Sequence, residues 1–222
     1  MSLDFHPLWL SLRVAAGALF LALPLGIGAA FWLRKRRFRF QNALESLFLL
    51  PLVLPPVVTG LLLLFLLGKR GPIGQILLAW GFQILFSPLA ATLAAAIVAF
   101  PLIFQSARGA FGGVDALLED AARGLGATPW RTLWSVTLPL AAPGLWSGAI
   151  LAFARALGEF GATVMVAGNV AGRSLTAPVA LYFAAENGNY QSAGQYAFWL
   201  GALNLAFLLT AGAFAKRRPQ IP

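Results

Sequence analysis

Long apolar runs separated by short polar segments dominate this chain. A helix needs about 20 residues to cross the ~30 Å hydrocarbon core of a bilayer, because each residue adds about 1.5 Å. Five runs reach that length, namely residues 8–33, 44–67, 88–107, 143–167 and 197–215. Backbone N–H and C=O groups in lipid must be paired within a segment, so each run predicts a helix. We therefore expect an all-α protein with five membrane spans.

Composition supports the same class. Of 222 residues, 59% are hydrophobic and only 10% are charged, and the mean hydropathy is +0.80. Soluble domains carry about 25% charged residues. The five runs leave no room for a second domain, so residues 1–222 are expected to form a single transmembrane domain. The chain has no cysteine, which excludes disulfide, zinc-thiolate and thiol chemistry.

The positions of the basic residues predict the orientation in the membrane. Cytoplasmic loops carry an excess of Lys and Arg. One set of loops holds Arg34, Lys35, Arg36, Arg37, Arg39, Arg108, Arg123, Arg131, Lys216, Arg217 and Arg218. The opposite set holds Lys69, Arg70 and Arg173. The first set is therefore expected in the cytoplasm, with the N-terminus outside and the C-terminus inside.

The basic cluster RKRRFR after the first span has three other interpretations. In a cleaved signal peptide the positive charge precedes a shorter apolar core, whereas here the cluster follows a longer one. Basic clusters also bind anionic lipid or nucleic acid. We favour a topological role for the cluster and expect no nucleic-acid partner.

Prolines interrupt the second apolar run. Pro51, Pro55 and Pro56 lie within it, and each proline removes a helical hydrogen bond and kinks the helix. Membrane helices tolerate such kinks where neighbouring helices or a cavity satisfy the freed carbonyls. The run therefore faces either other helices alone or a translocation pathway. We find no internal repeat of the kind common in secondary transporters, which argues against a self-contained carrier.

The segment between the third and fourth spans, residues 108–142, is polar and has its own helical pattern. Residues 118–140 read LEDAARGLGATPWRTLWSVTLPL. An apolar stripe at i, i+3, i+4 and i+7 predicts a helix, and consists of Leu118, Ala121, Ala122 and Leu125. Glu119 and Arg123 are four residues apart on another face and can pair.

Start and stop signals divide this segment into two helices. Gly126 predicts the end of the first helix, since glycine adopts the left-handed conformation without a steric cost. Thr128 and Pro129 are typical of an N-cap and a first helical position. The second helix is expected from Trp130 to about Val136, ending at Leu138-Pro139. A DNA-binding helix-turn-helix would need a basic face, which this segment lacks. A docking element for a cytoplasmic partner and an inert linker both remain open.

The same segment resembles the EAA loop of bacterial ABC-importer permeases. In that pattern Glu-Ala-Ala is followed by three residues, Gly, nine residues, Ile, one residue and Leu-Pro. This chain has Asp120-Ala121-Ala122, Gly126, Val136 and Leu138-Pro139 at the same spacing. The resemblance implies a coupling helix that seats in a groove of a separate ATPase subunit. The implied coupling residues are Glu119, Asp120, Ala121, Ala122, Gly126, Leu138 and Pro139, with either Glu119 or Asp120 as the key carboxylate.

A second stretch, residues 153–169, reads FARALGEFGATVMVAGN and is followed by Thr176-Ala177-Pro178 and Tyr182. It resembles the oxyanion branch of these permeases, most closely the molybdate permeases, as does LPLVLPPVVTGLLLL in the second span. Sulfate and thiosulfate permeases typically have Tyr, Gly and Ser in place of Phe160, Gly161 and Ala162.

Together the two resemblances imply a type I ABC importer permease fold in the inner membrane of a bacterium or archaeon. They also imply a homodimer, a cytoplasmic ATPase dimer that binds ATP and Mg²⁺, and an external oxyanion-binding protein. Molybdate is the implied cargo, with tungstate as a further possibility and sulfate or thiosulfate as the alternative. A gradient-driven carrier would leave the EAA loop unexplained.

Arg155 and Glu159 are four residues apart within the fourth span, where charge is costly unless it is paired. They form either a buried pair that fixes helix packing or a pathway feature. In the second case Arg155 attracts a dianion while Glu159 prevents tight trapping, because a conduction path must also release its substrate. The candidate pathway residues are Pro55, Pro56, Arg155, Gly158, Glu159, Gly161 and Thr163.

No catalytic or metal-binding pattern occurs in the sequence. The single histidine, His6, has no cysteine or carboxylate cluster around it and is expected to be solvated. A phosphate-binding loop of the Gly-x-x-x-x-Gly-Lys-Ser/Thr type is missing, so ATP hydrolysis must belong to a partner. We expect no enzyme activity and no bound cofactor. The external residues 168–195 either receive a substrate-delivering protein or form a plain solvated loop.

Overall fold

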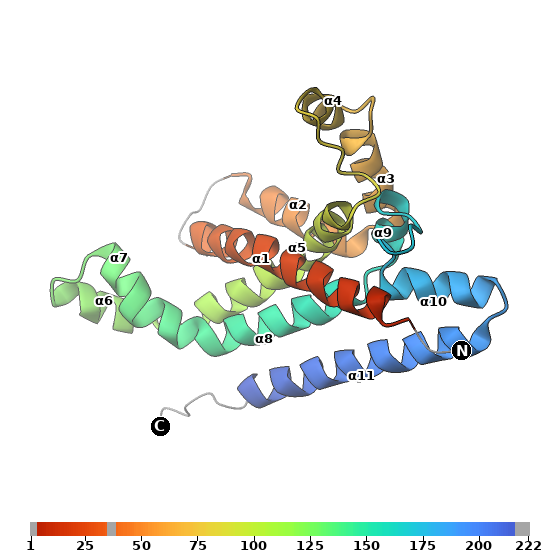
Figure 1. The fold of residues 1–222 in the computed structure, drawn as a ribbon. Helices are drawn as coiled ribbons and strands as arrows, with labels where there is room; N and C mark the ends of the chain where they lie inside the picture. Colours follow the sequence, from red (N-terminus) through yellow and green to blue (C-terminus); the bar gives the residue numbers. More distant parts are fainter. Residues whose placement is uncertain (1–3, 35–38, 216–222) are drawn as a thin grey trace.

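The computed structural model describes residues 4–34 and 39–215, and over these residues the chain is helical with no strand (Figure 1). The elements are α1 (His6–Arg34), α2 (Gln41–Val53), α3 (Pro56–Leu67), α4 (Pro72–Ala79), α5 (Pro88–Gly112), α6 (Ala116–Gly124), α7 (Pro129–Thr132), the π-helix η1 (Leu133–Thr137), α8 (Leu138–Leu157), α9 (Gly161–Val166), α10 (Ala177–Glu186) and α11 (Tyr190–Ala215). The predicted all-α class is confirmed.

Three helices in the described part are long and apolar enough to cross a membrane. They are α1, α5 and the continuous helix Pro129–Leu157, which joins α7, η1 and α8. The bent pair α2 and α3 makes a fourth span if it is counted as one. The fifth predicted span, residues 197–215, lies within the 26-residue helix α11.

The second predicted span is not one helix. Helices α2 and α3 meet at 106°, so the expected kink is a complete break. Leu54 is extended, as residues before proline are. Pro55 is also extended, with ψ of 132°, and α3 begins at Pro56. Two consecutive prolines thus remove two backbone donors and force two extended residues, which ends one helix before the next begins.

The fourth predicted span, residues 143–167, has different limits at both ends. The helix does not stop at Leu138-Pro139 as expected, because η1 and α8 continue α7 without a gap. The Leu138 N–H donates to the Leu133 carbonyl. This π turn is wider than an α turn and accommodates the ring of Pro139. At the other end α8 stops at Leu157, and Gly158 to Phe160 separate it from α9.

Small residues bring the central helices close together. α5 packs against α1, α2, α8 and α9. Its contact with α1 is lined on both sides by buried alanines, which are Ala15, Ala18 and Ala22 on α1 and Ala91, Ala94, Ala95 and Ala99 on α5. A Cβ added to Gly148 on α8 would lie 2.3 Å from Cβ of Ser106 on α5. Such close backbone approach allows the van der Waals packing that helps to hold helices together in lipid.

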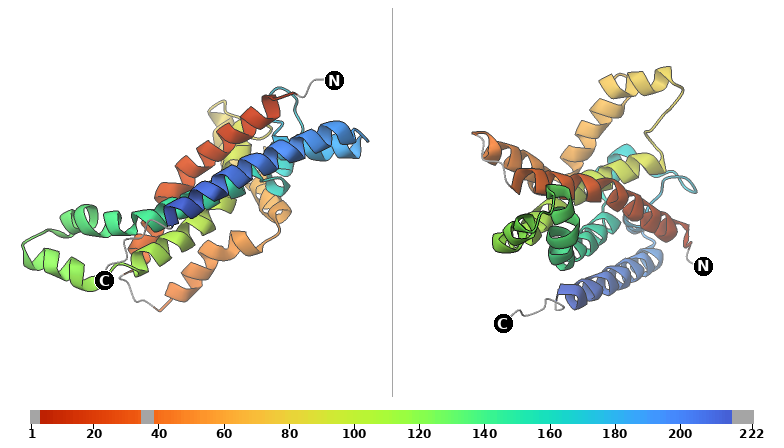
Figure 2. Two further views of the ribbon diagram at one scale, coloured as in Figure 1. Left: turned by 90° about the horizontal axis from the view of Figure 1, so that it is seen from below. Right: turned by 90° about the vertical axis from the view of Figure 1, so that its left-hand side faces the viewer.

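The molecule has two distinct ends (Figures 1 and 2). Helices α6 and α7 project beyond the C-terminal end of α1, whereas α9 and α10 lie near its N-terminal end. Arg34, Arg123 and Arg131 lie at the first end, on α1, α6 and α7. His6 is exposed at the opposite end of α1. The predicted cytoplasmic residues 35–37 and 216–218 lie outside the described residues.

Residues 168–195 are not a plain loop. They contain α10 and the start of α11, and Ser174, Thr176 and Ala177 within them are buried. The Ala177 N–H donates to Ser11 Oγ of α1 at 2.8 Å. Arg13, which the count of basic residues omitted, is exposed on α1 with its guanidinium carbon 5.1 Å from the ring centre of Trp9.

Candidate coupling element and membrane pathway

Local signals define the limits of α6. The Asp115 carboxylate accepts from the Leu117 N–H at 2.9 Å and caps the N-terminus. At the other end the Ala127 N–H donates to the Ala122 carbonyl and the Gly126 N–H donates to the Arg123 carbonyl. These two bonds form a Schellman motif, in which Gly126 has φ of +85°. The predicted role of Gly126 as the residue that ends the helix is confirmed.

The second helix also starts where the sequence predicts. Thr128 Oγ1 accepts from the Arg131 N–H at 3.3 Å, and Pro129 occupies the first helical position. Helices α6 and α7 thus form a tight helix-turn-helix. Because α7 continues through η1 into α8, this element is joined to the membrane domain by unbroken helix. A displacement of α7 therefore acts directly on α8.

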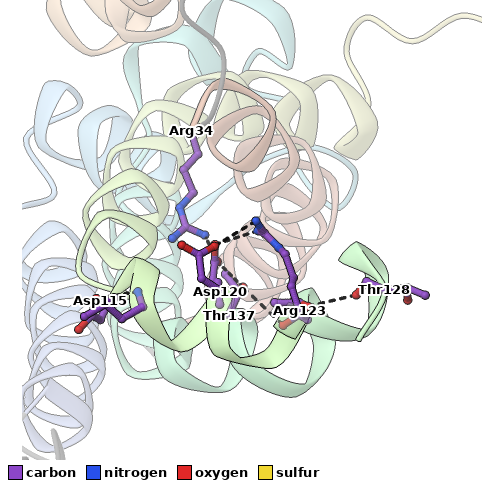
Figure 3. A network of polar contacts seen from close by, with 9 residues as sticks. Arg34, Asp115, Asp120, Arg123, Thr128 and Thr137 are labelled. Atoms are coloured by element: carbon purple, nitrogen blue, oxygen red, sulfur yellow. Dashed lines mark hydrogen bonds and ion pairs between the residues drawn. The ribbon is translucent and has the colours of Figure 1, made fainter. Parts of the chain in front are cut away.

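The two candidate carboxylates of α6 have opposite environments. Glu119 is buried, with a side chain 4% exposed, whereas the Asp120 side chain is 68% exposed. Glu119 Oε1 accepts from Arg34 at 2.5 Å and from Thr137 Oγ1 at 2.6 Å. Figure 3 shows the side chains of Arg34 and Arg123 close to α6. Arg123 also pairs with Asp120, with a nitrogen–oxygen distance of 3.3 Å. Of these two carboxylates, Asp120 is the one exposed to a partner in solution.

The other predicted coupling residues differ in exposure. Gly126, Ala121 and Pro139 are exposed, and Ala122 and Leu138 are half-buried. In the predicted stripe Leu118 and Leu125 are exposed, so this stripe is not part of the core of the described chain. The stripe thus lies on the surface of the element.

Sequence reasoning missed most of the apolar surface around this stripe. Leu125 and Leu117 are 91% and 73% exposed, and Trp130 and Trp134 are 68% and 58% exposed. The two tryptophan rings are in edge contact, with centroids 5.6 Å apart. Their spacing of i and i+4 was a usable signal, since it places both rings on one helix face. Exposed apolar patches of this kind mark sites of interaction with protein or membrane.

The candidate pathway residues converge where α3 meets α9. A Cβ added to Gly161 would lie 2.9 Å from Cβ of Pro56, and one added to Gly60 would lie 2.8 Å from Cα of Ala162. At these two glycines the backbones of α3 and α9 therefore lie in close contact. Pro55 is exposed at the break itself, and Pro56 is half-buried against α9. Gly60, which the sequence analysis did not single out, is as essential to this contact as Gly161.

The predicted pairing of Arg155 with Glu159 is confirmed, with a nitrogen–oxygen distance of 2.7 Å. The pair is not inside one helix, because Arg155 lies in the last turn of α8 and Glu159 follows its end at Leu157. The second oxygen of Glu159 accepts from the Ala162 N–H of α9 at 2.9 Å. Glu159 thus joins α8 to α9 across the break, with its side chain 1% exposed against 33% for Arg155.

Two threonines in the same region have buried hydroxyls without a hydrogen-bond partner in the described part of the chain, Thr163 on α9 and Thr59 on α3. Gly158, which directly follows the end of α8, is exposed. Phe160 is half-buried and its ring lies 5.0 Å from that of Tyr182 on α10. Charged residues, a buried hydroxyl and one ring of an aromatic pair thus lie between Arg155 and Thr163.

Comparisons with known proteins agree with this architecture. The chain is 46% identical over 187 residues to the putative molybdenum transport system permease protein YvgM of Bacillus subtilis, covering 83% of this chain and 82% of that protein. It is 47% identical over 180 residues to the molybdenum transport system permease protein ModB of Escherichia coli, covering 81% and 79%. The expected resemblance to molybdate permeases is confirmed.

Solved structures support the fold. The membrane protein of the MetNI methionine ABC transporter superimposes with a TM-score of 0.76 at 19% identity, covering 99% of this chain and 100% of that one. A chain of a bacterial ABC transporter that imports alginate gives 0.72 at 16% identity, covering 96% and 79%. These similarities show the type I ABC importer permease fold.

The helical membrane domain and its projecting helix-turn-helix define the membrane subunit of a transporter. More specifically, the chain belongs to the binding-protein-dependent transport system inner membrane component family, whose model matches residues 22–218. It is therefore a multi-pass membrane transport subunit and not an enzyme. Permeases of this class work with a separate ATPase and a substrate-binding protein.

Proposed function

We propose that this chain imports molybdate through the inner membrane, driven by a cytoplasmic ATPase dimer that docks on α6 and α7. The observation that carries the proposal is the exposed face of this element. Asp120, Leu125 and Trp130 are open to solvent at its tip, while unbroken helix connects α7 to α8. An apolar centre with a charged neighbour is the usual composition of an interface hot spot.

The cargo is inferred from the relatives. Both are called molybdenum transport permeases, and Phe160-Gly161-Ala162 differs from the pattern of sulfate and thiosulfate permeases. Tungstate is a further candidate cargo because it is an oxyanion of the same shape and charge. Sulfate or thiosulfate uptake is the alternative. A gradient-driven carrier is less favoured, since it would have no use for an exposed docking element.

The assembly we propose contains two copies of this chain, one ATPase dimer with ATP and Mg²⁺, and one external oxyanion-binding protein. Residues 1–222 would form one permease domain, with the N-terminus outside and the C-terminus in the cytoplasm. The pathway would run past the break between α8 and α9. There Arg155 would attract the dianion, and Glu159, which already pairs with Arg155, would prevent tight binding. Pro55, Pro56, Gly158, Gly161 and Thr163 would shape this passage.

The cargo is tested by uptake in reconstituted vesicles that contain this chain, its ATPase and its binding protein. Labelled molybdate is supplied with an excess of sulfate, thiosulfate or tungstate in separate reactions. We expect ATP-dependent molybdate uptake that tungstate inhibits and sulfate does not. Preferential uptake of sulfate, or uptake that continues without the ATPase, would contradict the proposal.

The docking face is tested with two exposed tryptophans. Trp130→Ala removes a ring from the centre of the proposed interface, where truncation of a hot-spot residue typically costs about 2 kcal/mol or more. We expect the affinity for the ATPase to fall by more than about tenfold. Trp146→Ala is the matched control, because Trp146 is 59% exposed on α8 away from the element. Equal affinities of the two variants for the ATPase would exclude α7 as a docking site.

A further inference from the structure

Glu119 lies on the element proposed to dock the ATPase, but it faces the membrane domain. Its side chain is 4% exposed. One carboxylate oxygen accepts from Arg34 and Thr137, and the other lies 3.4 Å from Arg123 on the same helix. A carboxylate this deeply buried is costly to hold unless it is paired. The charge of Glu119 is therefore explained by its contacts inside the protein.

The contacts of Glu119 join three segments that are distant in the chain. Arg34 is the last residue of α1 and lies 85 residues before Glu119. Thr137 is the last residue of η1 and lies 18 residues after it. Figure 3 shows the two side chains approaching α6 from different elements. One carboxylate thus connects α6 to α1 and to the start of α8.

The contact with Thr137 falls at the π turn. The hydrogen bond of a π turn spans one residue more than that of an α turn, and such turns are often found at functional sites. Thr137 Oγ1 donates to Glu119 and also lies 3.5 Å from the Thr132 carbonyl, which spans the turn. Fixing this hydroxyl fixes the joint at which α7 becomes α8.

We propose that Glu119 is a positioning residue that makes α6, the end of α1 and the π turn move as one body. The inference rests on the proposed function, since it assigns to Glu119 the transfer of movement and leaves contact with the ATPase to Asp120 and the apolar face. When the ATPase displaces α6, the displacement reaches α1 through Arg34 and α8 through Thr137. Without the carboxylate, α6 would still present its docking face but would move independently of α1.

The test is Glu119→Gln, which keeps the size of the side chain and removes its charge. Glu45→Gln is the matched control, because Glu45 pairs with Arg108 and accepts from Gln41, which places it between α2 and α5. Each variant is purified with the ATPase and reconstituted. We measure ATPase affinity, ATP hydrolysis and molybdate uptake, and report uptake per ATP hydrolysed.

We expect Glu119→Gln to keep its ATPase affinity within about threefold and to lose roughly tenfold or more in uptake per ATP, while Glu45→Gln keeps both. Arg34→Gln should show the same uncoupling, and the double variant should be little worse than either single one, because all three remove one connection. Thr137→Val, which removes only the hydroxyl, should assemble fully and uncouple by a smaller factor. Two outcomes would overturn the inference. One is a loss of uptake per ATP in the double variant that equals the product of the two single losses. The other is uptake per ATP in Glu119→Gln equal to that in Glu45→Gln.

A second measurement separates this inference from the proposed function. The chain has no cysteine, so Ala116→Cys allows a single spin label on the exposed start of α6 in the chain without its ATPase. We expect the label to be more mobile in Glu119→Gln than in Glu45→Gln. If label mobility differs between the variants as expected but the wild-type chain binds no ATPase, the proposed function is wrong and the role of Glu119 as a positioning residue still holds. If the ATPase binds and label mobility is the same in both variants, only the proposed role of Glu119 is wrong.

Discussion

Two regions of this protein break a helix, and they do so for different reasons. In the projecting helix-turn-helix, α6 ends at a glycine with positive φ and α7 starts at a threonine cap and a proline. In the membrane, α3 and α9 begin at breaks held by Pro55-Pro56 and by Glu159. All of these breaks are specified by residues within four positions, but those at α3 and α9 also lie where two helices that are far apart in sequence pack against each other.

The comparison explains the distribution of charge. At the exposed turn between α6 and α7, water can satisfy any carbonyl or N–H that a cap leaves free. In the membrane domain the start of α9 is buried, so a side chain must satisfy its N–H groups. Glu159 does so by accepting from the Ala162 N–H, and Arg155 balances its charge. At the break between α8 and α9, an ion pair thus satisfies the start of the new helix.

The largest effect is expected from Glu159→Ala. It leaves Arg155 unpaired and the Ala162 N–H unsatisfied, and removing one partner of a buried pair costs about 3–5 kcal/mol. Since Arg155 is one-third exposed, we expect a loss near the lower limit, about 3 kcal/mol. Thermal unfolding of the detergent-purified protein measures it. Glu186→Ala, at an exposed carboxylate on α10, is the control and should melt like wild type. A Glu159→Ala melting point equal to that control would refute the role of the carboxylate.

A smaller loss is expected where α3 meets α9. In Gly60→Ala the new methyl would lie 2.8 Å from Cα of Ala162, and backbone cannot yield as a flexible side chain does. Overpacking of this kind costs about 1–3 kcal/mol. Gly28→Ala adds the same methyl to α1 where nothing lies within 4 Å, so it should be neutral or stabilising. The same melting experiment compares them, and equal melting points would mean that α3 and α9 separate easily.

The smallest effect is expected at the turn between α6 and α7. Gly126→Ala meets no neighbour within 4 Å but forces alanine to φ of +85°, a conformation that costs about 1–2 kcal/mol. Gly124→Ala, two residues earlier in α6, also meets no atom within 4 Å and should be harmless. Hydrogen exchange of α6 amides reports this local change. Faster exchange in Gly124→Ala than in Gly126→Ala would mean that the left-handed turn is not what ends α6.

These two regions also show what could be predicted from sequence. The end of α6 and the start of α7 were predicted correctly, because caps act through residues only two or three positions away. The single helix over 44–67 and the helix end at Leu138-Pro139 were wrong. The sequence identified the prolines in both cases but not their effect on the helix. Pro55 and Pro56 together break it, whereas the π turn before Pro139 lets it continue. The pairing of Arg155 with Glu159 was correct, since charge in a membrane has few solutions.

The environment of Glu119 could not be read from sequence. Its spacing to Arg123 suggested an exposed helix pair, and the partner 85 residues away on α1 gave no local signal. Arg34 was counted only as a topological residue. The choice between Glu119 and Asp120 therefore required the structure, which buries one carboxylate and exposes the other.

The alanine-lined contact of α1 with α5 has a consequence for assembly. Between helices in lipid there is no hydrophobic gain to offset the ordering of side chains. Alanine has no rotamers to lose, whereas a buried leucine gives up about 0.5–1 kcal/mol of conformational freedom. The two helices can therefore associate with almost no entropic penalty from their side chains, even though more than 50 residues must be inserted between them first.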